Sequence, residues 1–273
     1  ASVLFNQAKK QSGAINSIEA IKEKTEKKLK KFQNQTEAER NLEVVTEIRK
    51  KNWFERYRWF MTTDGFLTIG GRDAASNSAV IRKHLDKNDK VFHGDIFGSP
   101  FFILKDAENV PDTTMNEIAH ATVCFSRAWR EALYGVSAYW VLPDQVKKSA
   151  PSGEFLPKGS FTIEGQRNFI KSETLKLAVG IIQLEDNDHV LTCGPPEAIK
   201  KNSICYAIIE PNGLEMAECA KKIRLEFLKI FEDITRKINI DEFVRALPAG
   251  KSQIKEISLG DLEKENIIDN ELE

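Results

Sequence analysis

The chain has 273 residues, of which 41% are hydrophobic and 30% are charged, and its formal net charge is −1. This length suffices for one large domain or for two modest domains with an arm, and no apolar run approaches the roughly 20 residues that a membrane span needs. The four cysteines, Cys124, Cys193, Cys205 and Cys219, form no CxxC pair, which argues against a zinc ribbon or a disulfide scaffold and favours a reducing cytoplasm.

The small net charge hides a gradient along the chain. Residues 1–60 carry 14 basic and 8 acidic side chains, whereas residues 172–273 carry 13 basic and 20 acidic ones. Such a gradient would orient the chain on a polyanion such as RNA. Lysine-rich helices that are simply solvated would explain the same composition.

The first predicted element is a helical arm over residues 1–57. Positions spaced by alternating steps of four and three residues form a largely apolar seam, which is typical of a coiled coil. The seam consists of Leu4, Ala8, Gln11, Ile15, Ile18, Lys22, Thr25, Leu29 and Phe32. Thr36 and Glu39 then form a capping box that begins a second helix. We expect an antiparallel helical hairpin, and a partner chain that covers the seam is the alternative.

The next predicted region, residues 58–172, begins with β-strands. Two β-rich runs flank Asp64-Gly65, which predicts a hairpin with a two-residue turn. Thr114 and Glu117 have the spacing of a capping box, which predicts the start of a long helix. The elements expected after the hairpin are a helix over 74–85, strands over 91–96 and 101–104, the helix from Thr114, a strand over 134–142, a loop over 143–159 and a strand over 160–163.

The last hundred residues are predicted to form a separate small α/β unit over residues 173–260. Its strands are expected over 175–184, 189–193 and 204–209, and its helices over 196–201, 214–237 and 241–246. Residues 261–273 are an acidic tail that we expect to be disordered. The predicted fold class is therefore α+β, with a mixed α/β core between a coiled-coil arm and a small C-terminal α/β extension.

A glycine-rich corner, Gly70-Gly71-Arg72-Asp73, follows the second predicted strand. Glycines permit a tight turn, Asp73 can cap the following helix, and Arg72 offers a forked cation to a phosphate. Asn77 lies one turn into that helix. These parts predict a phosphate cradle at a helix N-terminus, and an ordinary strand–turn–helix corner with a good cap is the alternative.

Two further groups of residues can bind ligands. His93 and Asp95 alternate along a predicted strand and should share a face, as metal ligands or as a structural pair; no further ligands with zinc spacing follow. The loop that contains Lys147 and Lys148 offers basic and hydroxyl groups to phosphates, or is a solvated loop.

Five aromatic residues cluster at the junction between the arm and the first strand. They are Trp53, Phe54, Tyr57, Trp59 and Phe60. Such side chains can stack on bases, but their density at a helix–sheet junction favours core packing for most of them. Catalytic patterns such as a GxSxG elbow, a P-loop or an HExxH helix do not occur, so nothing in the sequence demands an enzyme.

Taken together, several ordered blocks resemble the NFACT-R module of ribosome-associated quality-control proteins. They are residues 53–60, 63–74, 93–95 with Gly98 and Lys105, 145–146 with 150–156, 159–161 and 165–169. The preceding helical arm resembles part of the coiled-coil middle domain of the family, and the C-terminal unit resembles the extension of archaeal-type members.

The resemblance implies a non-enzymatic role in rescuing stalled translation in the cytoplasm. Family members bind the large ribosomal subunit that still holds peptidyl-tRNA, and they recruit tRNA so that a tail is added to the nascent chain without mRNA. The ribosome itself makes the peptide bond, and the NFACT-R module is regarded as an RNA-contacting unit. No cofactor, metal or membrane is implied.

Two departures from the family pattern affect these expectations. Phe97 stands where many members have a histidine, which weakens a metal site. The NFACT-N and helix–hairpin–helix domains have no counterpart in this sequence, so we do not expect the chain by itself to perform the full reaction. A fragment of a longer protein or a natural short form would each explain this.

The residues predicted to contact RNA combine the glycine corner, the polar groups near it and the basic loop. They are Arg58, Gly70, Gly71, Arg72, Asp73, Asn77, His93, Asp95, Ser99, Lys105, Lys147 and Lys148. Two other functions are compatible with the sequence. One is a metal-dependent phosphoesterase that uses His93, Asp95 and a carboxylate such as Asp64, and the other is an interaction module that self-associates through the coiled-coil arm.

Overall fold

A computed structural model describes residues 22, 23, 25, 26, 50–147, 160–184 and 188–263. The chain divides into two units, residues 1–45 and 46–273, and almost all described residues belong to the second. The predicted coiled-coil arm lies almost wholly outside the described residues, as does most of the predicted acidic tail. The fold of the second unit is α+β, as predicted, and its sheets are antiparallel.

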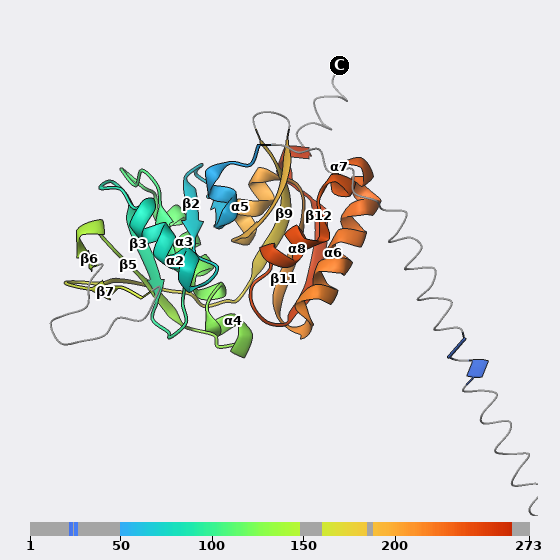
Figure 1. Cartoon of the computed structure of the whole chain (residues 1–273), viewed down its shortest axis with the longest axis horizontal. Coiled ribbons are helices and arrows are strands. Elements are labelled where there is room, and N and C mark those ends of the chain that lie inside the picture. The colour runs from blue at the N-terminus through green and yellow to red at the C-terminus, as the bar shows by residue number, and fades with distance from the viewer. Residues whose placement is uncertain (1–21, 24, 27–49, 148–159, 185–187, 264–273) are drawn as a thin grey trace, which may run out of the picture. The chain divides into compact units, whose positions relative to one another are not determined.

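The first sheet of this unit has six strands in the order β1-β2-β4-β3-β5-β8, of which β2, β3 and β5 are labelled in Figure 1. The strands are β1 Arg58–Met61, β2 Leu67–Gly70, β3 Lys90–Gly94, β4 Phe101–Leu104, β5 Ser137–Val141 and β8 Asn168–Lys171. Every residue of the central strand β4 is buried, because helices and neighbouring segments cover both of its faces. The first five strands were predicted from their β-rich runs, whereas β8, a short edge strand that is only partly buried, was not.

Three helices and a 3₁₀ turn accompany this sheet. The 3₁₀ turn η1 spans Trp53–Arg56, and the helices are α2 Ala74–Lys83, α3 Asp112–Cys124 and α4 Arg127–Glu131. Helix α3 packs against β3, β4, β5 and β8, and α2 packs against β2 and β4. Asp73 caps α2 as predicted, because its carboxylate accepts a hydrogen bond from the amide of Ser76 at 2.8 Å.

The predicted start of α3 at Thr114 was wrong. The helix begins at Asp112, and both Thr114 and Glu117 are buried against the hairpin between β1 and β2. Thr114 donates a hydrogen bond to Asp64 at 2.7 Å, and Glu117 accepts from the backbone amide of Thr63 at 2.9 Å. Their spacing therefore serves a tertiary contact and not a capping box.

The hairpin itself has a three-residue turn and not the predicted two-residue one. Thr62 donates its amide to Phe66 at 3.0 Å, which leaves Thr63, Asp64 and Gly65 as the turn. Gly65 has a φ of 84°, a left-handed conformation that glycine adopts without steric cost. Three-residue hairpins of this kind place glycine at the left-handed position.

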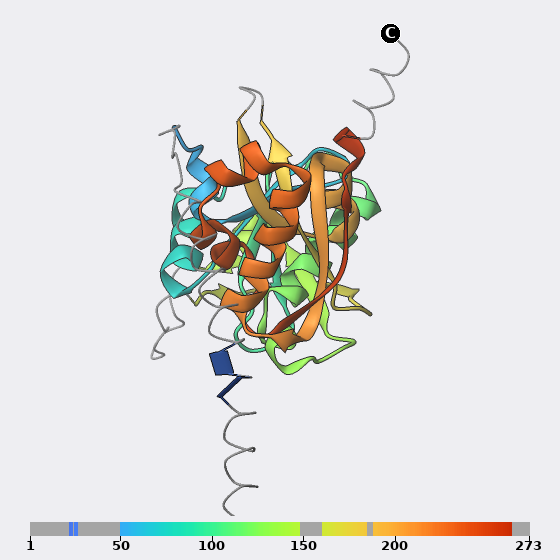
Figure 2. The same cartoon turned by 90° about the vertical axis from the view of Figure 1, so that its right-hand side faces the viewer.

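The second sheet has four strands in the order β10-β9-β11-β12. The strands are β9 Leu177–Gln183, β10 His189–Gly194, β11 Ser203–Leu214 and β12 Ser252–Leu259. The helices are α5 Pro196–Asn202, α6 Met216–Ile230, α7 Glu232–Lys237 and α8 Ile240–Ala246. Helix α6 packs against β11 and β12, and Figure 2 views the molecule from the side that α6 covers. The predicted helix over 214–237 is broken at Phe231 into α6 and α7.

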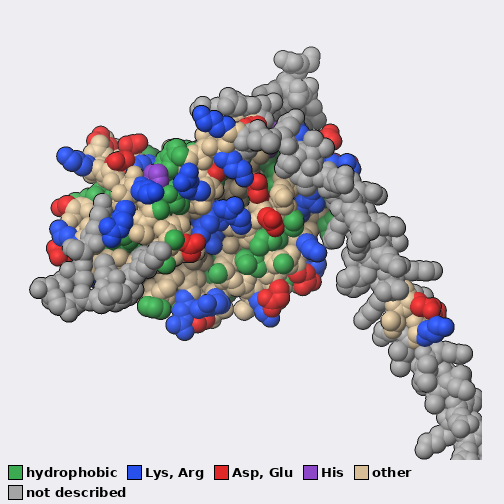
Figure 3. Space-filling model, viewed as in Figure 1, with side chains coloured by type: hydrophobic (Ala, Val, Ile, Leu, Met, Phe, Trp, Pro, Cys, Tyr) green, Lys and Arg blue, Asp and Glu red, His purple; other side chains and the backbone are tan. Residues whose placement is uncertain are grey.

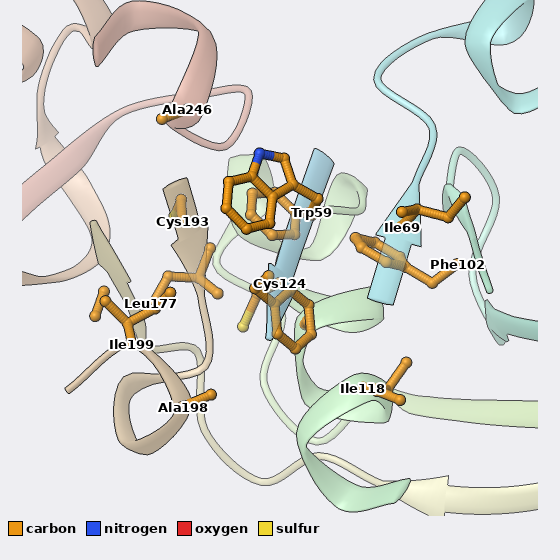
Figure 4. Close-up of a cluster of buried hydrophobic side chains, with 14 of the residues drawn as sticks. Trp59, Ile69, Phe102, Ile118, Cys124, Leu177, Cys193, Ala198, Ile199 and Ala246 are labelled. Atoms are coloured by element: carbon orange, nitrogen blue, oxygen red, sulfur yellow. The ribbon is translucent and has the colours of Figure 1, made fainter. Parts of the chain in front are cut away.

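The two sheets share one hydrophobic core. Figure 4 shows Ile69 and Phe102 of the first sheet in the same cluster as Leu177 and Cys193 of the second. The edge strands β1 and β10 lie against each other. The hydroxyl of Thr192 donates to the carbonyl of Trp59 across this junction. The predicted region 173–260 therefore packs directly on the predicted region 58–172, within one compact unit.

A small two-stranded sheet completes the unit. The 3₁₀ turn η2 spans Pro143–Gln145, and strands β6 Val146–Lys147 and β7 Thr162–Ile163 pair antiparallel. Residues 148–159, which include Lys148 and most of the predicted basic loop, lie outside the described residues. No helix in the described part of the chain has the length and apolar character that a membrane span requires.

Candidate functional site

Six of the residues predicted from sequence line one cavity with a volume of about 600 Å³, which we call the groove. These residues are Gly71, Arg72, Asp73, Asn77, His93 and Ser99. The turn between β2 and α2 supplies Gly71, Arg72 and Asp73, and α2 itself supplies Asn77. The end of β3 supplies His93, and the loop before β4 supplies Ser99. The groove is therefore built by segments that are adjacent in the first sheet although they are far apart in the sequence.

The glycine corner does not form the predicted phosphate cradle. The amide of Gly71 donates to Phe101 at 3.1 Å, and the amides of Arg72 and Asp73 both donate to the hydroxyl of Ser76, at 2.8 Å and 2.9 Å. These donors are occupied within the protein and cannot hold a phosphate without a rearrangement.

Close packing explains why two glycines occupy this corner. A side chain at Gly70 would collide with the ring of Phe102, and one at Gly71 would collide with the amide group of Asn77. The amide oxygen of Asn77 in turn accepts from the backbone of Phe101 at 3.2 Å, so Asn77 ties α2 to β4. The corner is thus a strand–turn–helix junction with a good cap, the alternative that the sequence left open.

The side chain of Arg72 turns away from the corner and into the protein. One terminal nitrogen, Nη2, donates to the carbonyl of Tyr57 at 2.8 Å, and Nη1 donates to the carbonyl of Arg245. The third nitrogen, Nε, is buried without a hydrogen-bond partner. Arg72 borders both the groove and a smaller cavity on its other side, which Arg58 also lines.

His93 and Asp95 do not act as a pair. Strand β3 ends at Gly94, so Asp95 lies just beyond the strand, where it is exposed and acts on His93 only as a nearby charge. The ring of His93 instead packs against Phe101, with ring centroids 4.5 Å apart, and faces the hydroxyl of Tyr139 at 3.4 Å. Burial lowers the pKa of His93 to about 4, so the ring is neutral at pH 7.

The geometry does not support a metal-dependent phosphoesterase. Asp64 lies in the hairpin turn, where it accepts a hydrogen bond from Thr114, and it does not line the groove with His93. Within the described ranges there is no group of three or more His, Cys, Asp or Glu side chains that could hold a metal ion.

The other predicted residues lie apart from the groove. Lys105 is held by Asp86 at 2.6 Å and Asp89 at 2.7 Å, so its charge is compensated. Lys147 lies on β6, where it donates to the carbonyl of Asp144 at 2.9 Å. Gly70 lies inside β2, and Asp95 does not line the groove.

The groove also contains residues that the sequence prediction of the site missed. Five aromatic side chains line it, namely Phe97, Phe101, Phe125, Tyr139 and Phe161. Phe97 is 87% exposed at the rim, although it is a large apolar residue. The guanidinium of Arg167 is also exposed and lies 4.8 Å from the centre of the Tyr139 ring. The sequence does contain one signal for this part of the groove: a bulky aromatic residue in the turn Phe97-Gly98-Ser99-Pro100, where it could be expected to be exposed.

Charge and aromatic area therefore coincide in the groove. Among the described residues that line it, Arg72 and Arg167 are the cations, Asp73 is the one carboxylate, and the ring of His93 is neutral. Several lysine and arginine side chains gather near the middle of the face shown in Figure 3, next to apolar side chains. Flat apolar rings beside guanidinium groups suit a ligand that has both a planar ring and a negative charge.

Comparison with known proteins gives concordant results. Residues 56–165 match the family described as the NFACT protein RNA binding domain. The chain is 36% identical to the archaeal Rqc2 homolog aRqcH of Methanocaldococcus jannaschii, over 78% of this chain and 31% of that protein. It is 31% identical to the ribosome quality control complex subunit NEMF homolog of Drosophila melanogaster, over 83% of this chain and 22% of that protein.

A third relative is the ribosome quality control complex subunit NEMF of Homo sapiens, with 32% identity over 64% of this chain and 16% of that protein. The chain thus spans less than a third of the length of these curated relatives.

Proposed function

Because this chain belongs to the NFACT family, in its archaeal type, we propose that its groove binds RNA on behalf of ribosome quality control. The observation that carries the proposal is that one cavity is lined both by an exposed aromatic, Phe97, and by Arg167, whose guanidinium lies against the ring of Tyr139. Base stacking on the aromatic ring and phosphate contact by the arginine are the two interactions that proteins use on unpaired RNA.

The proposed ligand is unpaired RNA and not a double helix. The groove is a cavity of about 600 Å³ whose walls include five aromatic rings. Within a duplex the faces of the bases are covered by their neighbours, so such rings can stack only on bases at loops, bulges or ends. The cations Arg72 and Arg167 would add attraction that does not depend on sequence.

In the cell, we propose that this binding contributes to the engagement of the large ribosomal subunit and of peptidyl-tRNA. The chain would help to recruit tRNA for mRNA-independent tailing of stalled nascent chains, while the ribosome makes the bond. The relatives are named as ribosome quality control subunits, which supports a cytoplasmic, ribosome-associated role. Residues 1–57 would contribute a coiled coil that positions the chain or allows it to self-associate.

The direct test is binding of a fluorescent single-stranded oligoribonucleotide, followed by anisotropy. Phe97→Ala should weaken binding by about tenfold, since stacking on one base contributes roughly 1–3 kcal/mol. Tyr134→Ala is the matched control, because Tyr134 is an aromatic that is 61% exposed and does not line the groove. Equal affinities of wild type and Phe97→Ala would reject the groove as the RNA site.

The ribosomal part of the proposal needs its own experiment. Large subunits that carry peptidyl-tRNA should co-sediment with the chain, and less of the Phe97→Ala chain should be recovered with them than of the Tyr134→Ala chain. If the chain does not sediment with these subunits at any salt concentration tested, ribosome engagement by this part of the protein is refuted.

A further inference from the structure

Three arginines converge beside the groove, around the smaller cavity that Arg72 also borders. They are Arg58 of β1, Arg72 at the start of α2, and Arg245 of α8, and we call them the arginine cluster. The cavity has a volume of about 40 Å³. Because one buried water needs a cavity of roughly 10–15 Å³, this cavity has room for about three water molecules or one small oxyanion.

Among the described residues, the guanidinium groups of the cluster are held by backbone carbonyls and not by carboxylates. Arg58 donates to the carbonyls of Ala246 at 3.3 Å and Leu247 at 3.2 Å, and Arg72 donates only to carbonyls. In the part of the chain that the structure describes, none of the three arginines forms an ion pair within 4.0 Å. Partly buried charges are ordinarily paired, so this arrangement is unusual.

Two carboxylates in the wall of the cavity are engaged elsewhere. Glu242 forms an ion pair with Lys51 at 3.1 Å. Glu55 accepts a hydrogen bond from the backbone amide of Asn52 at 2.7 Å, as part of the cap of η1. Neither carboxylate is in an ion pair with the three arginines, and the charge of Glu242 is matched by that of Lys51, which also lines the cavity.

Packing holds the guanidinium groups in place despite their mutual repulsion. Arg58 lies 4.2 Å from the centre of the Phe125 ring, and its hydrogen bonds fix the chain that leaves α8. Burial, and then the charge of Arg72, lower the pKa of Arg58 to about 9; burial, and then the charge of Arg245, lower that of Arg72 to about 10. A bound anion would relieve both effects.

Free donors remain for such an anion. A guanidinium has five N–H groups, and Arg72 uses two nitrogens on carbonyls while its buried Nε has no partner. Arg58 makes both of its hydrogen bonds through Nη1. Forked guanidinium groups match the oxygens of a phosphate, and several around a small cavity favour a tetrahedral oxyanion over a single planar carboxylate.

We propose that the arginine cluster binds a phosphate group. This extends the proposed function, because Arg72 borders both cavities and a phosphate held by the cluster could belong to an RNA chain whose base lies in the groove. The same chemistry is offered by a free phosphate or by the phosphate of a mononucleotide.

The first test uses inorganic phosphate alone, without RNA. Phosphate should raise the Tm of the full chain above that in sodium chloride of equal ionic strength, because a ligand that binds only the folded state stabilises it. Arg245→Gln should weaken the apparent phosphate affinity by about tenfold or more. The side chain of Arg245 is exposed, and only its backbone carbonyl holds Arg72, so this variant should fold normally.

Arg236→Gln is the control for loss of one positive charge, since Arg236 lies on α7, outside the cluster. Arg58→Lys keeps the positive charge but loses the forked guanidinium. It should therefore weaken phosphate binding, although phosphate should still raise the Tm of this variant. The proposal is overturned if phosphate stabilises no more than chloride does, or if Arg236→Gln loses as much affinity as Arg245→Gln.

The second test separates the two sources of phosphate. If the ligand is an RNA backbone, Arg245→Gln should weaken binding of an oligoribonucleotide, and inorganic phosphate should compete with it. If the ligand is free phosphate, phosphate should stabilise the protein while RNA binding is unaffected by Arg245→Gln. Either result supports the cluster as a phosphate site. Failure of the groove as an RNA site would be seen separately, as equal oligoribonucleotide affinities of wild type and Phe97→Ala.

Discussion

Two large cavities of this protein differ in the charge that lines them. The groove beside α2 has a volume of about 600 Å³, and the charged side chains that line it within the described ranges are Arg72, Arg167 and Asp73. The other cavity, between α3 and the second sheet, has a volume of about 990 Å³. Five carboxylates line it, namely Asp112, Glu117, Glu197, Glu210 and Glu256.

The cations of the second cavity do not change its sign. Lys176 and Lys255 both pair with Glu210, at 3.4 Å and 3.3 Å, which leaves the remaining carboxylates in excess. A phosphate backbone would be repelled there and attracted at the groove. The larger cavity is therefore the poorer candidate for RNA, and charge, not volume, distinguishes the two.

The largest expected effect is a charge reversal at the groove. Arg167→Glu replaces an exposed cation beside Tyr139 with an anion, and we expect RNA affinity to fall by about tenfold to a hundredfold at moderate salt. Lys255→Glu makes the same change at the acidic cavity and should leave affinity unchanged. Titrations by anisotropy measure both. Equal losses would mean that overall charge, and not the groove, governs binding.

Much of the first sheet could be predicted because its signals are local. The runs that became β1 to β5 are rich in β-branched and aromatic residues, and Gly65 marks the first turn. The strand β12 was missed because its two isoleucines, Ile254 and Ile257, are three residues apart with charged residues between them, so no two-residue period is visible. Its pairing with β11 along the sheet edge determines its conformation.

The candidate site was predicted only in part, because only some of its residues are placed by local sequence signals. Asn77 and His93 were found because Asn77 lies on the helix that follows β2 and His93 lies on β3, and both strands could be recognised in the sequence. The direction of the Arg72 side chain depends on Arg245, which is 173 residues away, and no local pattern reports that contact. The capping-box spacing of Thr114 and Glu117 gave a wrong helix start, because those side chains contact a hairpin that is distant in the sequence and do not cap the helix.

Two residues, His93 of the groove and Glu117 of the acidic cavity, should make the stability of the protein depend on pH in opposite directions. The folded-state pKa of His93 is about 4, below its ordinary value of 6.5, so the unfolded chain binds more protons between these values and stability falls as the pH is lowered through this window. Burial raises the pKa of Glu117, so the stability that its environment confers is greatest at low pH and decreases as pH rises through the raised value.

The two pH dependences can be distinguished by measuring the free energy of unfolding of single variants between pH 4 and 7. His93→Gln should lose less stability than wild type on acidification, by on the order of 2 kcal/mol after allowance for the partial exposure of the ring. Glu117→Gln should differ from wild type in the opposite sense, with a smaller amplitude. Parallel pH profiles for wild type and His93→Gln would contradict the placement of a neutral histidine in the wall of the groove.

The smallest expected effect is a change in the salt dependence of RNA affinity, and it is specific to a phosphate contact by Arg167. Neutral Arg167→Gln should reduce the slope of log affinity against log salt by about 0.7, the value for one phosphate contact on a single strand. Lys255→Gln, at the acidic cavity, should leave the slope unchanged. A loss of affinity at Arg167→Gln with an unaltered slope would mean that this guanidinium stacks on a base. The phosphate contact would then have to be made by other cations, and the arginine cluster, which borders the groove through Arg72, is the one that we propose.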